Sequence, residues 1–237
     1  MTIGLEFSSL FSVELIKKLA DDDDPIDLAK VSTLNDRQVS EMSNWSKQKF
    51  IEFLMENRHG SPFEHSVFRW RIEAPIFVWR EFMRHRIASY NEQSGRYTVM
   101  KPKFYIPDSN RNLVQIGKPG AYTFVPGTQE QYKFLFDSMV ETAHFVYGQY
   151  QKRLNIGIAK EVARMDLGLN IYSAAYVTMN ARALMNFLSL RVESKDSTYK
   201  SFPMFEIGEV ATSMEQGFKF NMPITHAAFV KFGRVQP

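Results

Sequence analysis

Apolar residues at helical spacing run through much of the chain and predict its longest elements. Between positions 130 and 153 they recur every three or four residues, which is typical of a long amphipathic helix. The same spacing predicts further helices at 46–56, 158–167, 181–193 and 203–218. A shorter helix is expected to begin at Pro75, and its apolar face would hold Ile76, Trp79 and Met83.

Strand patterns are fewer and lie apart from one another. Positions 68 to 73 alternate strictly between apolar and charged residues, which predicts a strand with one buried face, and 171–178 is a second expected strand. Residues 101–128 are rich in Pro, Gly, Asn and Lys and are expected to form an excursion with little regular structure. The expected class is therefore α+β, a mostly helical single domain over 1–237 with a small, largely antiparallel sheet.

The acidic run Asp21-Asp22-Asp23-Asp24-Pro25 predicts the start of a helix. Asp24 is expected to cap it and Pro25 to occupy the first position, where the missing N–H is not needed. The other acids suit the positive end of the helix dipole. A solvated acidic loop is the alternative, and it is compatible with a cap.

Composition excludes several classes of chemistry. The chain has no cysteine, so disulfides, zinc thiolates and thiol nucleophiles are all ruled out. A net charge of +3 is too mild to argue for nucleic acid, and no apolar run approaches the roughly 20 residues of a membrane span. The first residues lack a basic leader followed by an apolar stretch, so we expect no secretory signal and a cytoplasmic protein.

The stretch from Arg80 to Tyr97, REFMRHRIASYNEQSGRY, carries four arginines and two carboxylates. Clustered guanidinium groups repel one another unless anions neutralise them, and the guanidinium fork matches phosphate oxygens. Ser94-Gly95-Arg96 adds a hydroxyl, a flexible backbone amide and another guanidinium, which together suit a phosphate. A solvated basic face, or ion pairs between subunits, would explain the charge equally well.

The segment HGSPFEH at 59–65 offers two histidines and a glutamate. A metal site is disfavoured, because Pro62 interrupts the helix that zincin-type motifs need. A loop whose side chains cap backbone groups is the simplest interpretation, and a polar clamp on a ligand is the other.

The segment NARALMNFLSLR at 180–191 places Arg182 and Asn186 on one helix face, and Asn180 and Arg191 about three turns apart. Amides and guanidiniums arranged in this way can hold a heterocycle by its edge. The alternative is a plain N-cap at Asn180 with both arginines in solvent.

Taken together, these stretches resemble the flavin-dependent thymidylate synthases. The family signature is RHR, seven residues and then Ser, found here as Arg84-His85-Arg86, positions 87–93 and Ser94. Further blocks occur in the family's order: SPFEH at 61–65, APIFV at 74–78, SYNEQSGRY at 89–97, EVAR at 161–164 and NARALMNFLSLR at 180–191. The resemblance covers roughly 29–191, and five ordered blocks are far more specific than RHR alone.

The resemblance implies a homotetramer with FAD at subunit junctions. It implies reductive methylation of dUMP to dTMP, with methylenetetrahydrofolate as carbon donor and NADPH as reductant, and no nucleic-acid or membrane partner. The implied FAD-binding residues are His59, Ser61, Glu64, Arg84, His85, Arg86, Glu92, Asn180, Arg182 and Asn186. The implied dUMP shell consists of Glu81, Arg84, Glu92, Gln93, Ser94, Gly95, Arg96, Arg164 and Arg191.

Without a cysteine, the uracil ring must be activated in another way than by thiolate addition. A guanidinium at the ring edge would stabilise an anion on the ring, and Arg191 is the candidate. Ser94 resembles a residue once proposed as nucleophile. A hydroxyl without a nearby base is weakly nucleophilic, so a binding or polarising role is preferred for Ser94.

Two positions depart from many relatives: Gly168 stands where Pro is frequent, and Glu81 where some have Gln. A carboxylate beside a phosphate is unfavourable, so Glu81 is expected to contact sugar, a backbone amide or Arg80. The rival functions are a nucleic-acid-binding protein, a flavin-binding relative without turnover and a metal hydrolase built on 59–65. The source, a bacterium or a phage acting in its host's cytoplasm, stays open.

Overall fold

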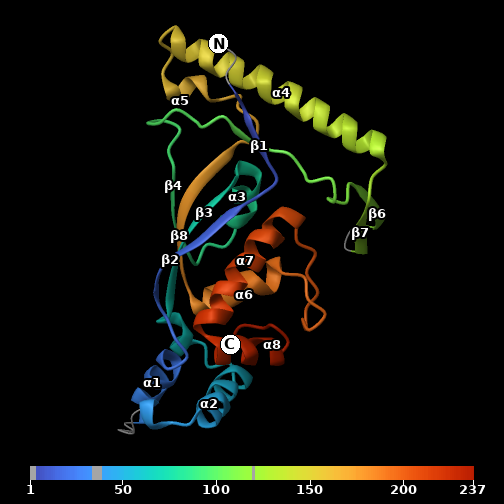
Figure 1. Ribbon diagram of the computed structural model, residues 1–237. Coiled ribbons are helices and arrows are strands. Elements are labelled where there is room, and N and C mark those ends of the chain that lie inside the picture. The colour runs from blue at the N-terminus through green and yellow to red at the C-terminus, as the bar shows by residue number, and fades with distance from the viewer. Residues whose placement is uncertain (1–3, 34–38, 119–120) are drawn as a thin grey trace. The chain divides into compact units, whose positions relative to one another are not determined.

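The computed structural model describes residues 4–33, 39–118 and 121–237 (Figure 1). The chain forms two compact units. The first consists of Met1–Phe11, Glu73–Arg80 and Glu92–Ala174, and the second of Ser12–Ile72, Glu81–Asn91 and Ala175–Pro237. Both units therefore draw on separate stretches of the chain, and no single boundary along the sequence divides them. The α+β class expected from the sequence is confirmed.

The second unit contains most of a four-stranded sheet with strand order β2–β3–β8–β4. The strands are β2 (Ser12–Leu19), β3 (Val67–Pro75), β8 (Tyr172–Asn180) and β4 (Ser89–Glu92). β3 and β8 confirm the two predicted strands. Alternation works as expected in β3, because Phe68, Trp70 and Ile72 are buried while Arg69 is exposed.

Five helices complete the described part of the second unit: α1 (Asp24–Lys30), α2 (Asn44–Glu56), α6 (Ala181–Arg191), α7 (Phe205–Asn221) and α8 (Pro223–Lys231). Helix α7 packs against α6, α8 and β2, and Figure 1 shows α6 and α7 side by side. A Cβ atom on Gly217 would lie 2.3 Å from Trp70 Cη2, so this close approach of α7 to β3 requires glycine. Short 3-10 turns occur at Val31–Thr33, Val39–Glu41 and Ser61–Glu64.

The first unit is organised around the long helix α4 (Gln129–Asn155), which confirms the longest predicted helix. Its other elements are β1 (Glu6–Ser8), α3 (Ile76–Phe82, entering the second unit at Glu81), β5 (Lys103–Tyr105), β6 (Val114–Lys118), β7 (Ala121–Val125) and α5 (Lys160–Ala163). Phe104, Tyr147, Tyr150 and Ile171 form the centre of its core. Thr128 and Gln131 make a capping box at the start of α4.

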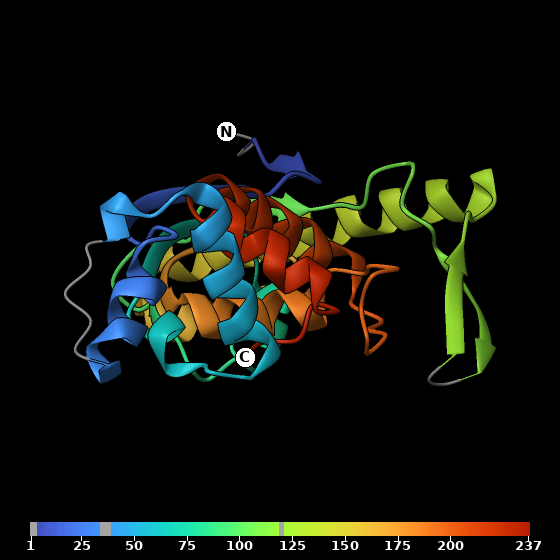
Figure 2. The same ribbon diagram turned by 90° about the horizontal axis from the view of Figure 1, so that it is seen from below.

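The stretch 101–128 is more regular than its composition indicates. β5 pairs in parallel with β1, and β6 and β7 form an antiparallel hairpin that leads into α4 (Figure 2). These strands are too short to show a long alternation, so their pairing partners, and not their own pattern, stabilise them.

Three other expectations also need correction. The helix expected at 158–167 is confined to Lys160–Ala163, because turns begin again at Arg164 and Gly168. The turn preference of Asn91 predicts a loop at this position, but Asn91 lies in β4, because strand pairing outweighs that preference. Met83 lies beyond the end of α3 and is 38% exposed.

The acidic run begins a helix as expected, but its side chains act in other ways. Asp24 lies inside α1 and Asp23 occupies the cap position without a side-chain cap bond. The Asp23 carboxylate instead accepts from Lys47 Nζ at 2.6 Å. Asp22 caps a different helix, α8, accepting the backbone N–H groups of Ile224 and Thr225 at 2.8 Å each.

Candidate functional site

The best-defined polar group of the second unit is centred on Arg191, the last residue of α6. Arg191 Nη1 donates to Glu81 Oε2 at 2.9 Å, and Arg191 Nε donates to His85 Nε2 at 3.1 Å. The side chains of Arg191 and Glu81 are 20% and 37% exposed. We call Glu81, His85 and Arg191 the Arg191 centre. It brings together three residues that the sequence placed in the site from segments far apart in the chain.

His85 is uncharged at neutral pH. Burial, together with the Arg191 guanidinium, lowers the pKa of His85 from 6.5 to about 4. Because Nε2 accepts the N–H of Arg191, the proton of the neutral ring lies on Nδ1. The ring also meets Phe187 edge-on, with 4.8 Å between centroids. His85 is therefore a neutral acceptor that points inward from a strongly basic motif.

A tyrosine holds the backbone of that motif in place. The Tyr90 hydroxyl donates to the carbonyl of His85 at 2.7 Å and lies 3.2 Å from the carbonyl of Phe82. Burial raises the pKa of Tyr90 to about 12, so it remains a donor throughout the physiological range. The sequence reasoning missed Tyr90, although its position inside the SYNEQSGRY block was the available signal.

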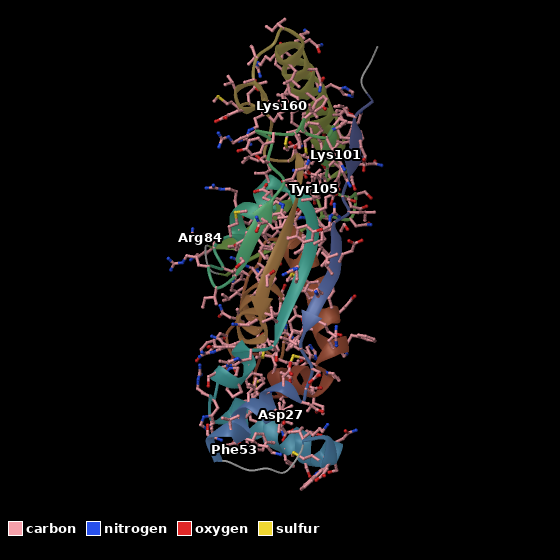
Figure 3. The ribbon with its side chains drawn as sticks, turned by 90° about the vertical axis from the view of Figure 1, so that its left-hand side faces the viewer. Asp27, Phe53, Arg84, Lys101, Tyr105 and Lys160 are labelled. Atoms are coloured by element: carbon pink, nitrogen blue, oxygen red, sulfur yellow. The ribbon has the colours of Figure 1, made fainter. Side chains whose placement is uncertain are left out.

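The two arginines on either side of His85 behave differently from it. Arg84 and Arg86 are exposed, and neither has a hydrogen-bond or ion-pair partner among the described residues. Figure 3 shows the Arg84 side chain extending away from the ribbon. Two unneutralised guanidiniums on one short turn are suited to binding phosphate oxygens.

Another group in the second unit joins the start of α6 to the turn at Ser61–Glu64. Arg182 donates from Nη1 to Glu64 Oε1 and from Nε to the carbonyl of Pro237 at 2.7 Å. A Cβ on Gly60 would lie 2.5 Å from Arg182 Nε, so glycine lets the guanidinium pass. Ser61 is exposed in this turn.

The remaining expected residues of this unit occupy ordinary structural positions. His59 is exposed and stacks on Phe53 with 5.7 Å between ring centroids. Asn180 is the N-cap of α6, accepting from the N–H of Ala183 at 2.8 Å, so the capping interpretation was right for its carbonyl oxygen. Asn186 is half-buried on α6.

In the first unit, residues 94–98 form a tight turn that we call the Ser94 loop. The Ser94 carbonyl accepts the N–H groups of Tyr97 and Thr98 at 3.2 and 3.1 Å. The Ser94 hydroxyl accepts the N–H of Arg96 at 3.3 Å, and no carboxylate or imidazole contacts it among the described residues. A hydroxyl in this setting has no general base beside it.

The Ser94 loop packs closely on Arg164. A Cβ on Gly95 would lie 2.9 Å from Arg164 Cδ and 2.8 Å from Met100 Sδ, so only glycine fits there. The Nε of Arg164 is buried and has no hydrogen-bond partner among the described residues. A buried donor without an acceptor is costly, and an anionic ligand at the loop would satisfy it.

Two carboxylates border the same loop. Arg96 Nε donates to Glu161 Oε2 at 2.9 Å, with the two side chains 53% and 51% exposed. Glu92 Oε1 accepts from the buried hydroxyl of Ser173 at 2.6 Å. Gln93 donates its backbone N–H to the carbonyl of Ala174 at 2.8 Å. The sequence reasoning used only the arginine of the EVAR segment and missed its glutamate; Ser173 carried no sequence signal.

Among the described residues, no three His, Cys, Asp or Glu side chains gather in a way that could hold a metal ion. Glu64 is engaged with Arg182 and His59 with Phe53, so the 59–65 segment is arranged for other contacts.

Comparisons with known proteins point in one direction. The family model described as thymidylate synthase complementing protein matches residues 14–224. A flavin-dependent thymidylate synthase of Tropheryma whipplei (strain TW08/27) is 54% identical over 232 residues, 98% of this chain and 97% of the relative. The enzyme of the same name from Streptomyces coelicolor is 45% identical over 236 residues, 98% of this chain and 96% of the relative.

Solved structures agree with these relatives. A UMP/dUMP methylase, PolB from Streptomyces cacaoi, bound with 5-Br dUMP, superposes with a TM-score of 0.92 and is 43% identical, covering 98% of this chain and 100% of its own. The same protein bound with 5-Br UMP gives a TM-score of 0.91 at 42% identity, covering 98% and 99%.

Proposed function

Because the chain belongs to the flavin-dependent thymidylate synthases, matched nearly end to end by the relatives above, we propose that it converts dUMP to dTMP. In this proposal FAD is the cofactor, methylenetetrahydrofolate the carbon donor and NADPH the reductant. The enzyme is a methyltransferase, as its relatives are named.

The observation that carries the proposal is a surplus of guanidinium donors without protein acceptors. Arg84 and Arg86 are exposed and unpaired among the described residues, and Arg164 has a buried Nε with no partner. FAD carries a pyrophosphate and dUMP a phosphate, and both would supply the missing acceptors. This donor set fits both ligands.

FAD would be held by the groups described in the second unit. When bound, it supplies the redox chemistry, which no side chain of the chain can provide. Arg84 and Arg86 would neutralise its phosphates, and the neutral His85 would offer Nδ1–H as a donor. The other proposed contacts are His59, Ser61, Glu64, Glu92, Asn180, Arg182 and Asn186.

Nucleotide binding falls to the Ser94 loop in this proposal. The backbone N–H groups of Ser94 and Gly95, the Ser94 hydroxyl and the guanidiniums of Arg96 and Arg164 would hold the phosphate. Ser94 binds and polarises here and does not attack, because nothing beside it can take its proton. The other proposed dUMP contacts are Arg84, Glu92, Gln93 and Gly95.

Arg191 is the proposed activating residue. Since the chain lacks cysteine, the ring cannot be activated by thiolate addition. A guanidinium at the ring edge stabilises negative charge on the ring, which raises electron density at the carbon to be methylated. The half-buried position of Arg191 strengthens this effect, because little water competes.

We also propose a homotetramer in the cytoplasm. Phe134, Phe136 and Phe145 on α4 are 74%, 51% and 66% exposed, and α4 buries only Ala143, Tyr147 and Tyr150. So much exposed aromatic surface on one helix is typical of a subunit interface. The described ranges hold no helix long and apolar enough to cross a membrane.

The test is to supply FAD during purification, desalt, and record the visible spectrum and dTMP formation by chromatography. We expect retained flavin and dTMP production that requires dUMP, the folate and NADPH. A folded protein that retains no flavin and makes no dTMP would overturn the proposal.

A second candidate, methylation of the ribonucleotide UMP, is favoured by one observation, the similarity to a UMP/dUMP methylase bound with 5-Br UMP. Supplying UMP in place of dUMP in the same assay decides between a deoxyribonucleotide enzyme and one that takes both.

A further inference from the structure

We propose that Glu81 is a positioning residue for Arg191. Together with His85 it fixes the guanidinium so that Nη2 is presented to the pyrimidine. The inference rests on the proposed function, in which Arg191 acts on the uracil ring. It assigns Glu81 a task different from the substrate contact that the family resemblance implies.

The contacts of Arg191 leave little freedom to its guanidinium. Nε donates to His85 and Nη1 to Glu81, so two of the three nitrogens are engaged by two different side chains. Nη2 has no hydrogen-bond partner among the described residues. A planar group held at two of its nitrogens cannot rotate about its last bond, so the direction of Nη2 is set before any ligand arrives.

The supports of both partners are rigid. Phe82, next to Glu81, stacks on Phe187, with 4.5 Å between centroids and 30° between planes. Phe187 lies one helical turn before Arg191 on α6, and both phenylalanines are fully buried. Glu81 and Arg191 thus project from backbones that this ring pair holds together.

A direct contact of Glu81 with the dUMP phosphate is the weaker interpretation. Two anions at hydrogen-bond distance repel each other, and the Glu81 carboxylate already has a cation at 2.9 Å. Its charge also has a consequence for Arg191, because a carboxylate beside the guanidinium reduces the positive field available to a ring anion. Glutamine at 81 would keep the acceptor oxygen and remove that charge.

The matched variants are therefore Glu81→Ala, which removes the acceptor, and Glu81→Gln, which keeps it. Asp137→Asn serves as control, because Asp137 is an exposed carboxylate paired with Lys133 on α4. Thermal melts of all variants establish that they are folded before the other measurements are interpreted.

The first readout is the titration of His85, which does not depend on activity. The chain has five histidines, so NMR of protein labelled at histidine Cε1 is tractable, with His85→Gln for assignment. Wild type, Glu81→Gln and Asp137→Asn should show His85 uncharged down to pH about 5. In Glu81→Ala the released guanidinium moves off the ring, and the pKa of His85 should rise above that of wild type, although burial still holds it below 6.5. A His85 pKa in Glu81→Ala equal to that of wild type overturns the proposal, because Arg191 then keeps its place beside His85 without Glu81.

The second readout is the kinetic split for dTMP formation. Glu81→Ala should lower kcat about 100-fold with the KM for dUMP within about twofold, the pattern of a misplaced activating group. Glu81→Gln should restore kcat to within about threefold of wild type. A Glu81→Ala enzyme that raises only KM would instead make Glu81 a substrate ligand and contradict the proposal. If wild type itself makes no dTMP, the proposed function fails, and the His85 titration alone decides whether Glu81 positions Arg191.

Discussion

Two arginine–glutamate pairs in this protein share one geometry and differ in their surroundings. Arg191 meets Glu81 and Arg96 meets Glu161, each at 2.9 Å. The first pair is 20% and 37% exposed, and His85 accepts a hydrogen bond from its arginine. The second pair is 53% and 51% exposed, and the Arg96 guanidinium lies 5.8 Å from the centre of the Tyr97 ring. The two ion pairs therefore have the same length and differ in how far they are buried.

The difference matters for what each arginine can do. An exposed pair is worth about 0–1 kcal/mol, so a stronger anion displaces its carboxylate easily. The Arg191–Glu81 pair is more buried and therefore costs more to break, because separation leaves a partly buried charge without a partner. We therefore expect Arg96 to exchange Glu161 for a ligand, and Arg191 to keep Glu81 while it works.

The largest expected effect is that of Arg191→Ala. It removes the group proposed to stabilise charge on the ring and should lower dTMP formation about 100- to 1,000-fold while FAD remains bound. Activity assays with the visible spectrum of the same sample measure both quantities. Arg69→Ala, which removes an exposed arginine of β3 outside the proposed contacts, is the control. Turnover near that of wild type in Arg191→Ala would contradict the proposal that Arg191 activates the ring.

Arg96→Ala should act on binding more than on turnover. Losing a charge-assisted phosphate contact should weaken dUMP binding about 10- to 100-fold, with kcat at saturating dUMP changed much less. Calorimetric titration of dUMP into the flavin-loaded protein gives the affinity. An unchanged affinity would place the phosphate away from the Ser94 loop.

His85, the third member of the Arg191 centre, should also make stability depend on pH. Because the pKa of His85 falls from 6.5 unfolded to about 4 folded, the unfolded state binds more protons between these values. Stability is then greatest above pH 6.5 and should fall by about 1–2 kcal/mol on going to pH 5. Urea unfolding at pH 7 and pH 5, in wild type and His85→Gln, measures this loss of stability. An equal loss in both proteins would mean that a group other than His85 causes it.

The smallest effect is expected for Glu161→Gln. Removing the exposed competitor of Arg96 should change the free energy of unfolding by less than about 0.5 kcal/mol and tighten dUMP binding no more than about threefold. Denaturation and the same calorimetric titration test both numbers. A large loss of stability would show that the Arg96–Glu161 pair contributes more than its exposure indicates. The two arginine–glutamate pairs would then no longer differ in strength.

The sequence predicted the helices well where the apolar period was long, as in α4, and failed where tertiary pairing decided the outcome. β5 exists because β1 lies beside it, and Asn91 is in a strand because β4 pairs in the sheet. Helix α8 was not anticipated, since its nine residues are too few to show a helical period.

The candidate residues were taken from motifs and from the family resemblance, and neither of these gave their partners. Arg191 and Glu81 are 110 residues apart, and neither segment contains a local sign that the two side chains meet. The same holds for Ser173 and Glu92, 81 residues apart. Which arginines are neutralised and which stay available depends on the fold, so a single sequence could give the charge of the site but not its distribution.

The bond from Asp22 to the start of α8 has a consequence for how the protein is made. It joins residues 202 and 203 positions apart, so the ribosome has to release almost the whole chain before that helix can be capped. Closing so long a loop is slow. Strand β2 and helix α2 are synthesised early, but they pack against α7 and α8, which are synthesised last. During that interval the incomplete second unit should be more prone to aggregation than the finished one.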